Sequence, residues 1–193
     1  MIEEKPKTVK PSASTASRTR AIAYVAMTIA IIAVSAWVTV PIGPVPFTLQ
    51  MFAVTFALLI LKPKQAIAAI AGYLALGAIG VPVFSGMRGG IGVLMGPTGG
   101  FLWGYLIGVS VAVGVLSLFR SRGIENFGVC VLCGILFTAI AYTCGWFQYM
   151  FVASVGPLES FLVTVAPFIV VDLIKIIAAT AVGRIVMRTV PLR

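Results

Sequence analysis

Six long apolar segments, separated by short polar or glycine- and proline-rich breaks, constrain this chain more than any other feature of its sequence. A helix needs about 20 mostly apolar residues to cross the hydrocarbon core of a bilayer. Only 10% of the 193 residues are charged, whereas a soluble domain has about 25%. The apolar segments are residues 21–40, 47–61, 65–81, 98–119, 127–155 and 158–186. The sequence therefore predicts an all-α integral membrane protein with six transmembrane helices in a single domain, residues 20–193, whose short second segment is tilted or partly extended near the membrane surface.

The distribution of Lys and Arg predicts how these helices are oriented. Cytoplasmic loops of membrane proteins carry an excess of basic residues. If the N-terminus is cytoplasmic, only Arg88 of the 14 Lys and Arg lies in an outer loop, and Lys175 lies within the sixth segment. The other 12, including Arg184 near the end of that segment, are on the cytoplasmic side. Both termini are therefore predicted to be cytoplasmic, with residues 1–19 as a disordered basic tail. The net charge of +9 is explained by anchoring to the lipid bilayer, so a nucleic-acid partner is not expected.

Small residues recur at intervals of four in two of the segments. Such stripes allow helix backbones to approach closely. In the fourth segment the stripe is Gly100, Gly104, Gly108 and Ala112, which predicts close packing inside the bundle. Ala26 and Ala30 form a shorter stripe in the first segment.

One pair of ionisable residues lies inside an apolar segment. Asp172 and Lys175 are three residues apart, so they share one face of a helix and each offsets the burial cost of the other's charge. Charged groups within a bilayer are expensive and usually functional. We therefore interpret the pair as a substrate-binding acceptor and donor; an ion pair that only fixes helix packing is the alternative.

Further polar residues fall on the predicted outer side. Arg88 lies in a glycine-rich loop, where it is either a solvated residue or a donor to an anionic group. Thr98 and Gly99 follow Pro97 at the start of the fourth segment, where free backbone N–H groups suit an anion or a carbonyl oxygen. Thr48 and Gln50 follow the first outer loop, and a glutamine side chain can both donate and accept.

Two aromatic residues near the outer end of the fifth segment complete the candidate site. Trp146 and Tyr149 are assigned to substrate binding, although aromatic residues also collect at membrane interfaces without any other role. Tyr73, Tyr142 and Gln148 are further polar candidates.

The residue types exclude several classes of function. The chain has no His and only three Cys, so neither a metal site nor a Ser-His pair can be assembled, and Cys130 and Cys133 are interpreted as small apolar helix residues. No nucleotide-binding Gly-Lys-Ser/Thr motif is present, and the segments are too apolar to line a channel. The sequence favours a membrane protein that binds a small molecule, rather than an enzyme.

Several motifs together resemble the BioY family, the biotin-binding S components of energy-coupling factor (ECF) transporters. They are, in chain order, Gly43-Pro-Val-Pro-Phe-Thr-Leu-Gln50, Gly80-Val-Pro-Val-Phe84, Gly96-Pro-Thr-Gly-Gly100, Tyr142-x-x-Gly145-Trp146 and Pro167-Phe-x-x-x-Asp172-x-x-Lys175. The resemblance extends over nearly the whole chain from residue 21 onward.

The resemblance implies a six-helix S-component bundle in a prokaryotic cell (plasma) membrane, with an outward-facing biotin site and no cofactor. It implies a transmembrane coupling protein (the T component) and two ATPase subunits as partners, with Ala26 and Ala30 contacting the T component; self-association stays open. Asp172 would accept a ureido N–H of biotin while Lys175 donates to polar ligand atoms. The carboxylate would meet Arg88 or the N–H groups at residues 98–100.

Three alternatives remain at this point. The chain could be an S component for another vitamin, such as thiamine or riboflavin. It could be a structural membrane subunit without a ligand. It could also be a proton-coupled carrier in which Asp172 is the proton site.

Overall fold

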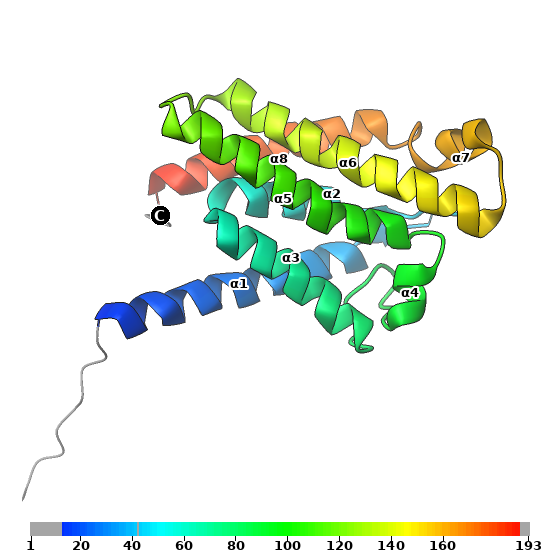
Figure 1. The fold of residues 1–193 in the computed structure, drawn as a ribbon, viewed down its shortest axis with the longest axis horizontal. Helices are drawn as coiled ribbons and strands as arrows, with labels where there is room; N and C mark the ends of the chain where they lie inside the picture. The colour runs from blue at the N-terminus through cyan, green and yellow to red at the C-terminus, as the bar shows by residue number, and fades with distance from the viewer. Residues whose placement is uncertain (1–12, 42, 190–193) are drawn as a thin grey trace, which may run out of the picture.

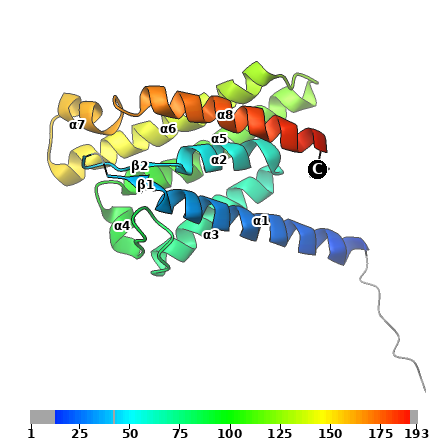
Figure 2. The ribbon, with the colours of Figure 1, turned by 180° about the vertical axis from the view of Figure 1, so that it is seen from behind.

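The structure is a computed structural model that describes residues 13–41 and 43–189 as an elongated helical bundle (Figure 1). The elements are α1 Ala13–Trp37, β1 Thr39–Val40, β2 Phe47–Thr48, α2 Gln50–Ile60, α3 Pro63–Ala78, α4 Ile91–Met95, α5 Gly99–Ser121, α6 Phe127–Ala153, α7 Pro157–Thr164 and α8 Ile169–Thr189. Both views place β1, β2, α4 and α7 at one end, called here the hairpin end (Figures 1 and 2). The start of α1 and the end of α8 lie at the opposite end (Figures 1 and 2).

Local sequence explains where several helices begin. Pro63 occupies the first turn of α3, where its missing N–H and fixed φ are tolerated. Asn126 caps α6 by accepting a hydrogen bond from the backbone N–H of Val129 at 2.9 Å. Because Pro63 begins a new helix, α2 and α3 are separated at residues 61–62, next to the break that the sequence predicts.

Three described helices are long and apolar enough to cross a membrane: Ser17–Trp37 within α1, together with α5 and α6. The pair formed by α7 and α8 makes a fourth candidate, bent by 45°. The helices α2 and α3 have 11 and 16 residues and are shorter than a complete span. The prediction of a mostly helical membrane protein is thus supported, whereas the count of six transmembrane segments stays a prediction.

Two predicted boundaries are corrected by the structure. The sixth apolar segment is not one helix, because residues 165–168 form turns between α7 and α8; Pro167 lacks an N–H and its ring clashes with a preceding helical turn. Residues 13–19 of the predicted disordered tail belong to α1, and residues 1–12 lie outside the described part of the chain.

The first and second apolar segments meet in a short antiparallel hairpin. Thr39 pairs with Thr48, and Val40 pairs with Phe47. The prediction that the second segment is partly extended is therefore confirmed for residues 47–48. The hairpin carries Thr48 and the start of α2 to the hairpin end of the bundle.

The glycine stripe of α5 packs against α6, as predicted. A Cβ atom added at Gly104 would lie 2.6 Å from Cα of Ala141, and one added at Gly108 would lie 2.8 Å from the carbonyl oxygen of Phe137. Real Cβ atoms do not approach other atoms this closely. The stripe therefore brings the backbones of α5 and α6 together and fixes the side of α5 that faces the rest of the bundle.

Candidate substrate-binding site

A cavity of about 620 Å³, including its open mouth, lies at the hairpin end. Its walls come from the hairpin, α2, the loop between α3 and α4, and the helices α4 to α8. The lining residues are Val45, Pro46, Thr48, Gln50, Met51, Phe84, Ser85, Arg88, Val93, Thr98, Phe101, Leu102, Tyr105, Tyr142, Thr164, Phe168, Asp172 and Lys175.

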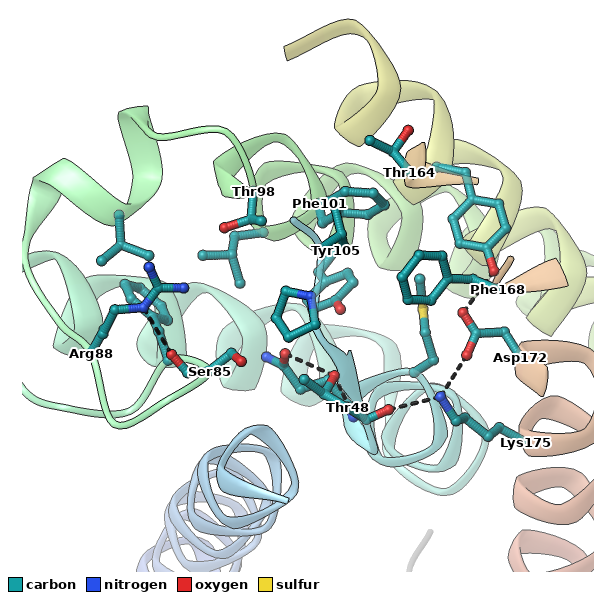
Figure 3. Close-up of a pocket in the computed structure, with 18 residues that line it drawn as sticks. Thr48, Ser85, Arg88, Thr98, Phe101, Tyr105, Thr164, Phe168, Asp172 and Lys175 are labelled. Carbon is teal, nitrogen blue, oxygen red and sulfur yellow. Dashed lines mark hydrogen bonds and ion pairs between the residues drawn. The ribbon is translucent and has the colours of Figure 1, made fainter. Parts of the chain in front are cut away.

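A buried ion pair forms one end of this cavity (Figure 3). Nζ of Lys175 lies 2.7 Å from Oδ1 of Asp172, and the two side chains are 13% and 4% exposed. The hydroxyl of Tyr142 donates to Oδ2 of Asp172 at 2.7 Å, and Lys175 also donates to the carbonyl oxygen of Thr48 at 2.8 Å. The predicted sharing of one helix face is confirmed. Each carboxylate oxygen still has a lone pair for a further donor.

The break before α8 places Asp172 in the first turn of that helix, at the cavity wall. Since α8 begins at Ile169, Asp172 lies in the first turn of the helix, where a negative charge interacts favourably with the helix dipole. Phe168, just before the helix, stacks on Phe47 of the hairpin with ring centroids 4.2 Å apart. This contact holds the start of α8 against β2.

Gln50 belongs to a second polar network that joins the cavity to the loop after α3. Its amide nitrogen donates to the hydroxyl of Tyr73 at 2.8 Å, and Tyr73 donates in turn to the carbonyl oxygen of Val83 at 3.0 Å. The hydroxyl of Thr48 donates to Oε1 of Gln50 at 3.2 Å. The side chain of Gln50 is therefore fixed in orientation at the cavity wall.

Arg88 lies at the other end of the cavity from the ion pair (Figure 3). Its Nε donates to the carbonyl oxygen of Ser85 at 3.1 Å, and the backbone N–H of Phe84 donates to its carbonyl oxygen at 2.9 Å. These bonds hold the loop in a tight bend, while the rest of the exposed guanidinium is left for an anion. A cationic group at one end and a carboxylate at the other give the cavity two chemically distinct ends.

Three predicted site residues do not line the cavity. Gly99 packs tightly against the carbonyl oxygen of Leu94, and its own N–H donates to the carbonyl oxygen of Gly96 at 3.0 Å. Trp146 donates from Nε1 to the carbonyl oxygen of Pro157 at 2.9 Å, so it joins α6 to α7. Tyr149 is buried in α6 away from the lining set.

The remaining predicted residues are brought together, and aromatic residues that the sequence did not single out join them. Thr48, Gln50, Arg88, Thr98, Asp172 and Lys175 all line the cavity. Phe101 and Tyr105, one helical turn apart on α5, line it as well. Their spacing of four places them on one helix face, but only the tertiary structure shows that this face points into the site.

Comparison with known proteins identifies the family. The sequence profile of the BioY family matches residues 7–192. The chain belongs to the BioY family. The biotin transporter BioY of Thermotoga maritima is 38% identical over 154 residues, covering 80% of this chain and 88% of that protein. The probable biotin transporter BioY of Pyrococcus horikoshii is 40% identical over 166 residues, covering 86% of this chain and 93% of that protein.

A solved structure agrees with this membership in BioY. The S component for biotin from an ECF-type ABC transporter superposes with a TM-score of 0.84 at 25% sequence identity. The match covers 93% of this chain and 95% of the solved chain. The bundle described here is therefore an S-component fold. Within residues 13–41 and 43–189, no group of three His, Cys, Asp or Glu is placed to hold a metal ion.

Proposed function

We propose that this BioY-family chain binds biotin as the S component of an ECF transporter and takes part in biotin uptake across the cell membrane. The observation that carries the proposal is a cavity with a buried Asp172–Lys175 pair at one end, Arg88 at the other and aromatic walls between. Like its relatives, the chain is a multi-pass transport protein and not an enzyme. Biotin is its transported ligand, not a cofactor.

Biotin has the matching chemistry. Its ureido ring offers two N–H donors and one strong acceptor, which suit the free lone pairs of Asp172 and the remaining ammonium hydrogen of Lys175. Its carboxylate suits the guanidinium of Arg88. The rings and the valeryl chain would pack on the apolar and aromatic wall that includes Phe101 and Phe168. Thiamine carries a permanent positive charge and would leave Arg88 facing a cation.

Equilibrium binding to the detergent-purified chain tests this assignment. We expect biotin to bind tightly, and thiamine and riboflavin not to bind. Biotin amide, which lacks the carboxylate charge, is expected to bind about tenfold more weakly because it forfeits the charge-assisted bond to Arg88. Folded protein that binds none of these compounds, or prefers another vitamin, would refute the proposal.

We further propose that six segments cross the membrane with both termini in the cytoplasm. The positive-inside distribution of Lys and Arg supports this orientation, and the start of α1 and the end of α8 lie at the same end of the bundle (Figure 1). At about 1.5 Å per residue, α2 and α3 are each shorter than the hydrocarbon core of a bilayer. The hairpin and its adjoining loops would therefore cover the rest of each crossing. Labelling of single cysteines at the exposed Arg122 and Gly156 by an impermeant thiol reagent on intact cells tests it: only the second should react.

The partner interface is proposed to include α1. Ala26 and Ala30 are both exposed on this helix, one turn apart, which leaves a smooth strip where another helix can approach closely. The protein that packs against this strip would be the T component, whose movement is powered by ATP hydrolysis in the two ATPase subunits. Replacing both alanines with leucine should abolish co-purification with the T component and leave biotin binding intact. Loss of self-association alone would point instead to contact between copies of this chain.

A further inference from the structure

Tyr105 presents an unused hydroxyl to the cavity. The residue is 5% exposed and lines the cavity from α5. The neighbouring polar groups of Asp172 and Gln50 are hydrogen-bonded within the protein. Among the described residues, the Tyr105 hydroxyl has no such partner. It is also not sealed inside the protein, unlike the unpartnered hydroxyls of Thr55, Thr138 and Thr180.

Packing fixes the direction of this hydroxyl. The Tyr105 ring lies against Phe137 of α6, with centroids 5.8 Å apart and planes tilted by 50°. The adjacent Gly104 holds α5 directly on α6, so the ring has little room to turn. A buried polar group without a partner is costly, and one that is already oriented loses little freedom when a ligand supplies the partner. The Tyr105 hydroxyl is therefore already oriented to form a hydrogen bond with a ligand atom.

The position of Tyr105 restricts which ligand atom this is. Figure 3 shows Tyr105 between Arg88 and the Asp172–Lys175 pair. A biotin that extends from one end to the other therefore passes the hydroxyl. The carboxylate is directed to Arg88, and the ureido N–H groups are donors directed to Asp172. The ureido oxygen is a strong acceptor with two lone pairs, so it can accept from a second donor besides Lys175, whereas the ring sulfur is a weak acceptor.

We propose that Tyr105 donates a hydrogen bond to the ureido oxygen of biotin and so helps to set the specificity of the site. This inference rests on the proposed function and adds a residue and an atom to it. Two helices would then contact the ureido group: Asp172 of α8 would accept from an N–H, and Tyr105 of α5 would donate to the oxygen beside Lys175. A ligand without an acceptor at this position would leave the tyrosine hydroxyl unpaired.

Binding of biotin and two analogues to Tyr105→Phe tests the assignment. Desthiobiotin lacks the sulfur but keeps the ureido oxygen, whereas 2-iminobiotin replaces that oxygen with a nitrogen that is protonated at neutral pH. We expect Tyr105→Phe to lose about tenfold in affinity for biotin and for desthiobiotin, and to bind 2-iminobiotin as the unaltered protein does. Tyr24→Phe, which removes a tyrosine hydroxyl from α1 outside the cavity, is the matched control and should bind all three normally. Thermal unfolding of both variants reports whether the fold is intact.

The outcomes separate this inference from the function beneath it. If the unaltered protein binds biotin and Tyr105→Phe binds it with the same affinity, the proposed role of Tyr105 is wrong and the proposed function stands. An equal loss for biotin and 2-iminobiotin, or a loss for biotin that disappears with desthiobiotin, would overturn the assignment to the ureido oxygen. If the unaltered protein binds no biotin, the proposed function fails, and this inference fails with it.

Discussion

Replacing Asp172 with asparagine is expected to lower biotin affinity by about 10- to 100-fold. The substitution removes the charged acceptor proposed for the ureido N–H, and a hydrogen bond to a charged group contributes about 1.5–3 kcal/mol. It also leaves Lys175, whose side chain is 13% exposed, without its counter-ion, which costs about 3–5 kcal/mol in a buried pair. Equilibrium binding and thermal unfolding in detergent measure the two effects separately.

A double variant decides whether the pair binds ligand or only stabilises packing. In Asp172→Asn combined with Lys175→Met, no buried charge is left unpaired, so the stability lost in the single variant should largely return. Biotin binding should not return, because the charged acceptor and the ammonium donor are both missing. Recovery of both stability and binding would mean that the ion pair serves packing alone. Glu159→Gln, which neutralises an exposed carboxylate on α7 outside the cavity, should affect neither.

The second large effect is expected from Gly104→Ala. The added methyl group would lie 2.6 Å from Cα of Ala141 and 3.0 Å from its carbonyl oxygen. Both atoms belong to the backbone of α6 and cannot rotate away, so α5 and α6 must separate. We expect a loss of about 3 kcal/mol, at the upper end of the range for overpacked positions, seen as a marked fall in the midpoint of thermal unfolding.

A glycine on the same helix provides the control. A Cβ atom at Gly114 would have nothing within 4 Å, and the position is exposed. Gly114→Ala is therefore expected to leave stability unchanged or to raise it slightly, because alanine loses less conformational freedom than glycine in a helix. Equal destabilisation by both substitutions would show that the close contact between α5 and α6 is not the cause.

The long uninterrupted helices were accessible from sequence. The fourth and fifth apolar segments, residues 98–119 and 127–155, correspond to α5 at Gly99–Ser121 and α6 at Phe127–Ala153. Both segments are apolar throughout and are bounded by charged residues or by turn-forming glycine and proline. The period of the small residues on α5 also predicted correctly that this face packs inside the bundle.

The break between α7 and α8 was not predicted, because hydropathy does not distinguish a helix from a turn. Residues 165–168 are all apolar, so the segment reads as continuous. Pro167 was the only local signal, and a proline within a membrane helix can equally well produce a kink. The break matters because it sets the first turn of α8 and hence the position of Asp172.

The candidate site was predictable where chemistry is unusual for its surroundings. Ionisable residues inside a membrane segment usually pair with one another, so the 2.7 Å contact between Asp172 and Lys175 was anticipated. Trp146 and Tyr149 do not line the cavity, and an aromatic residue near a helix end suits an interface as well as a cavity. Tyr105 was missed because the direction of its hydroxyl depends on how α5 packs on α6, which no local pattern specifies.

The close seam between α5 and α6 has an evolutionary consequence. Substitution at Gly100, Gly104 or Gly108 is opposed by backbone atoms of α6 or by side chains fixed on it, whichever vitamin the cavity holds. These positions should therefore change slowly among S components of differing substrate preference. The cavity wall on the other elements remains free to diversify. Invariant residues along the seam would indicate a common ancestral fold, and variation at Tyr105 or Arg88 would indicate a change in the transported vitamin.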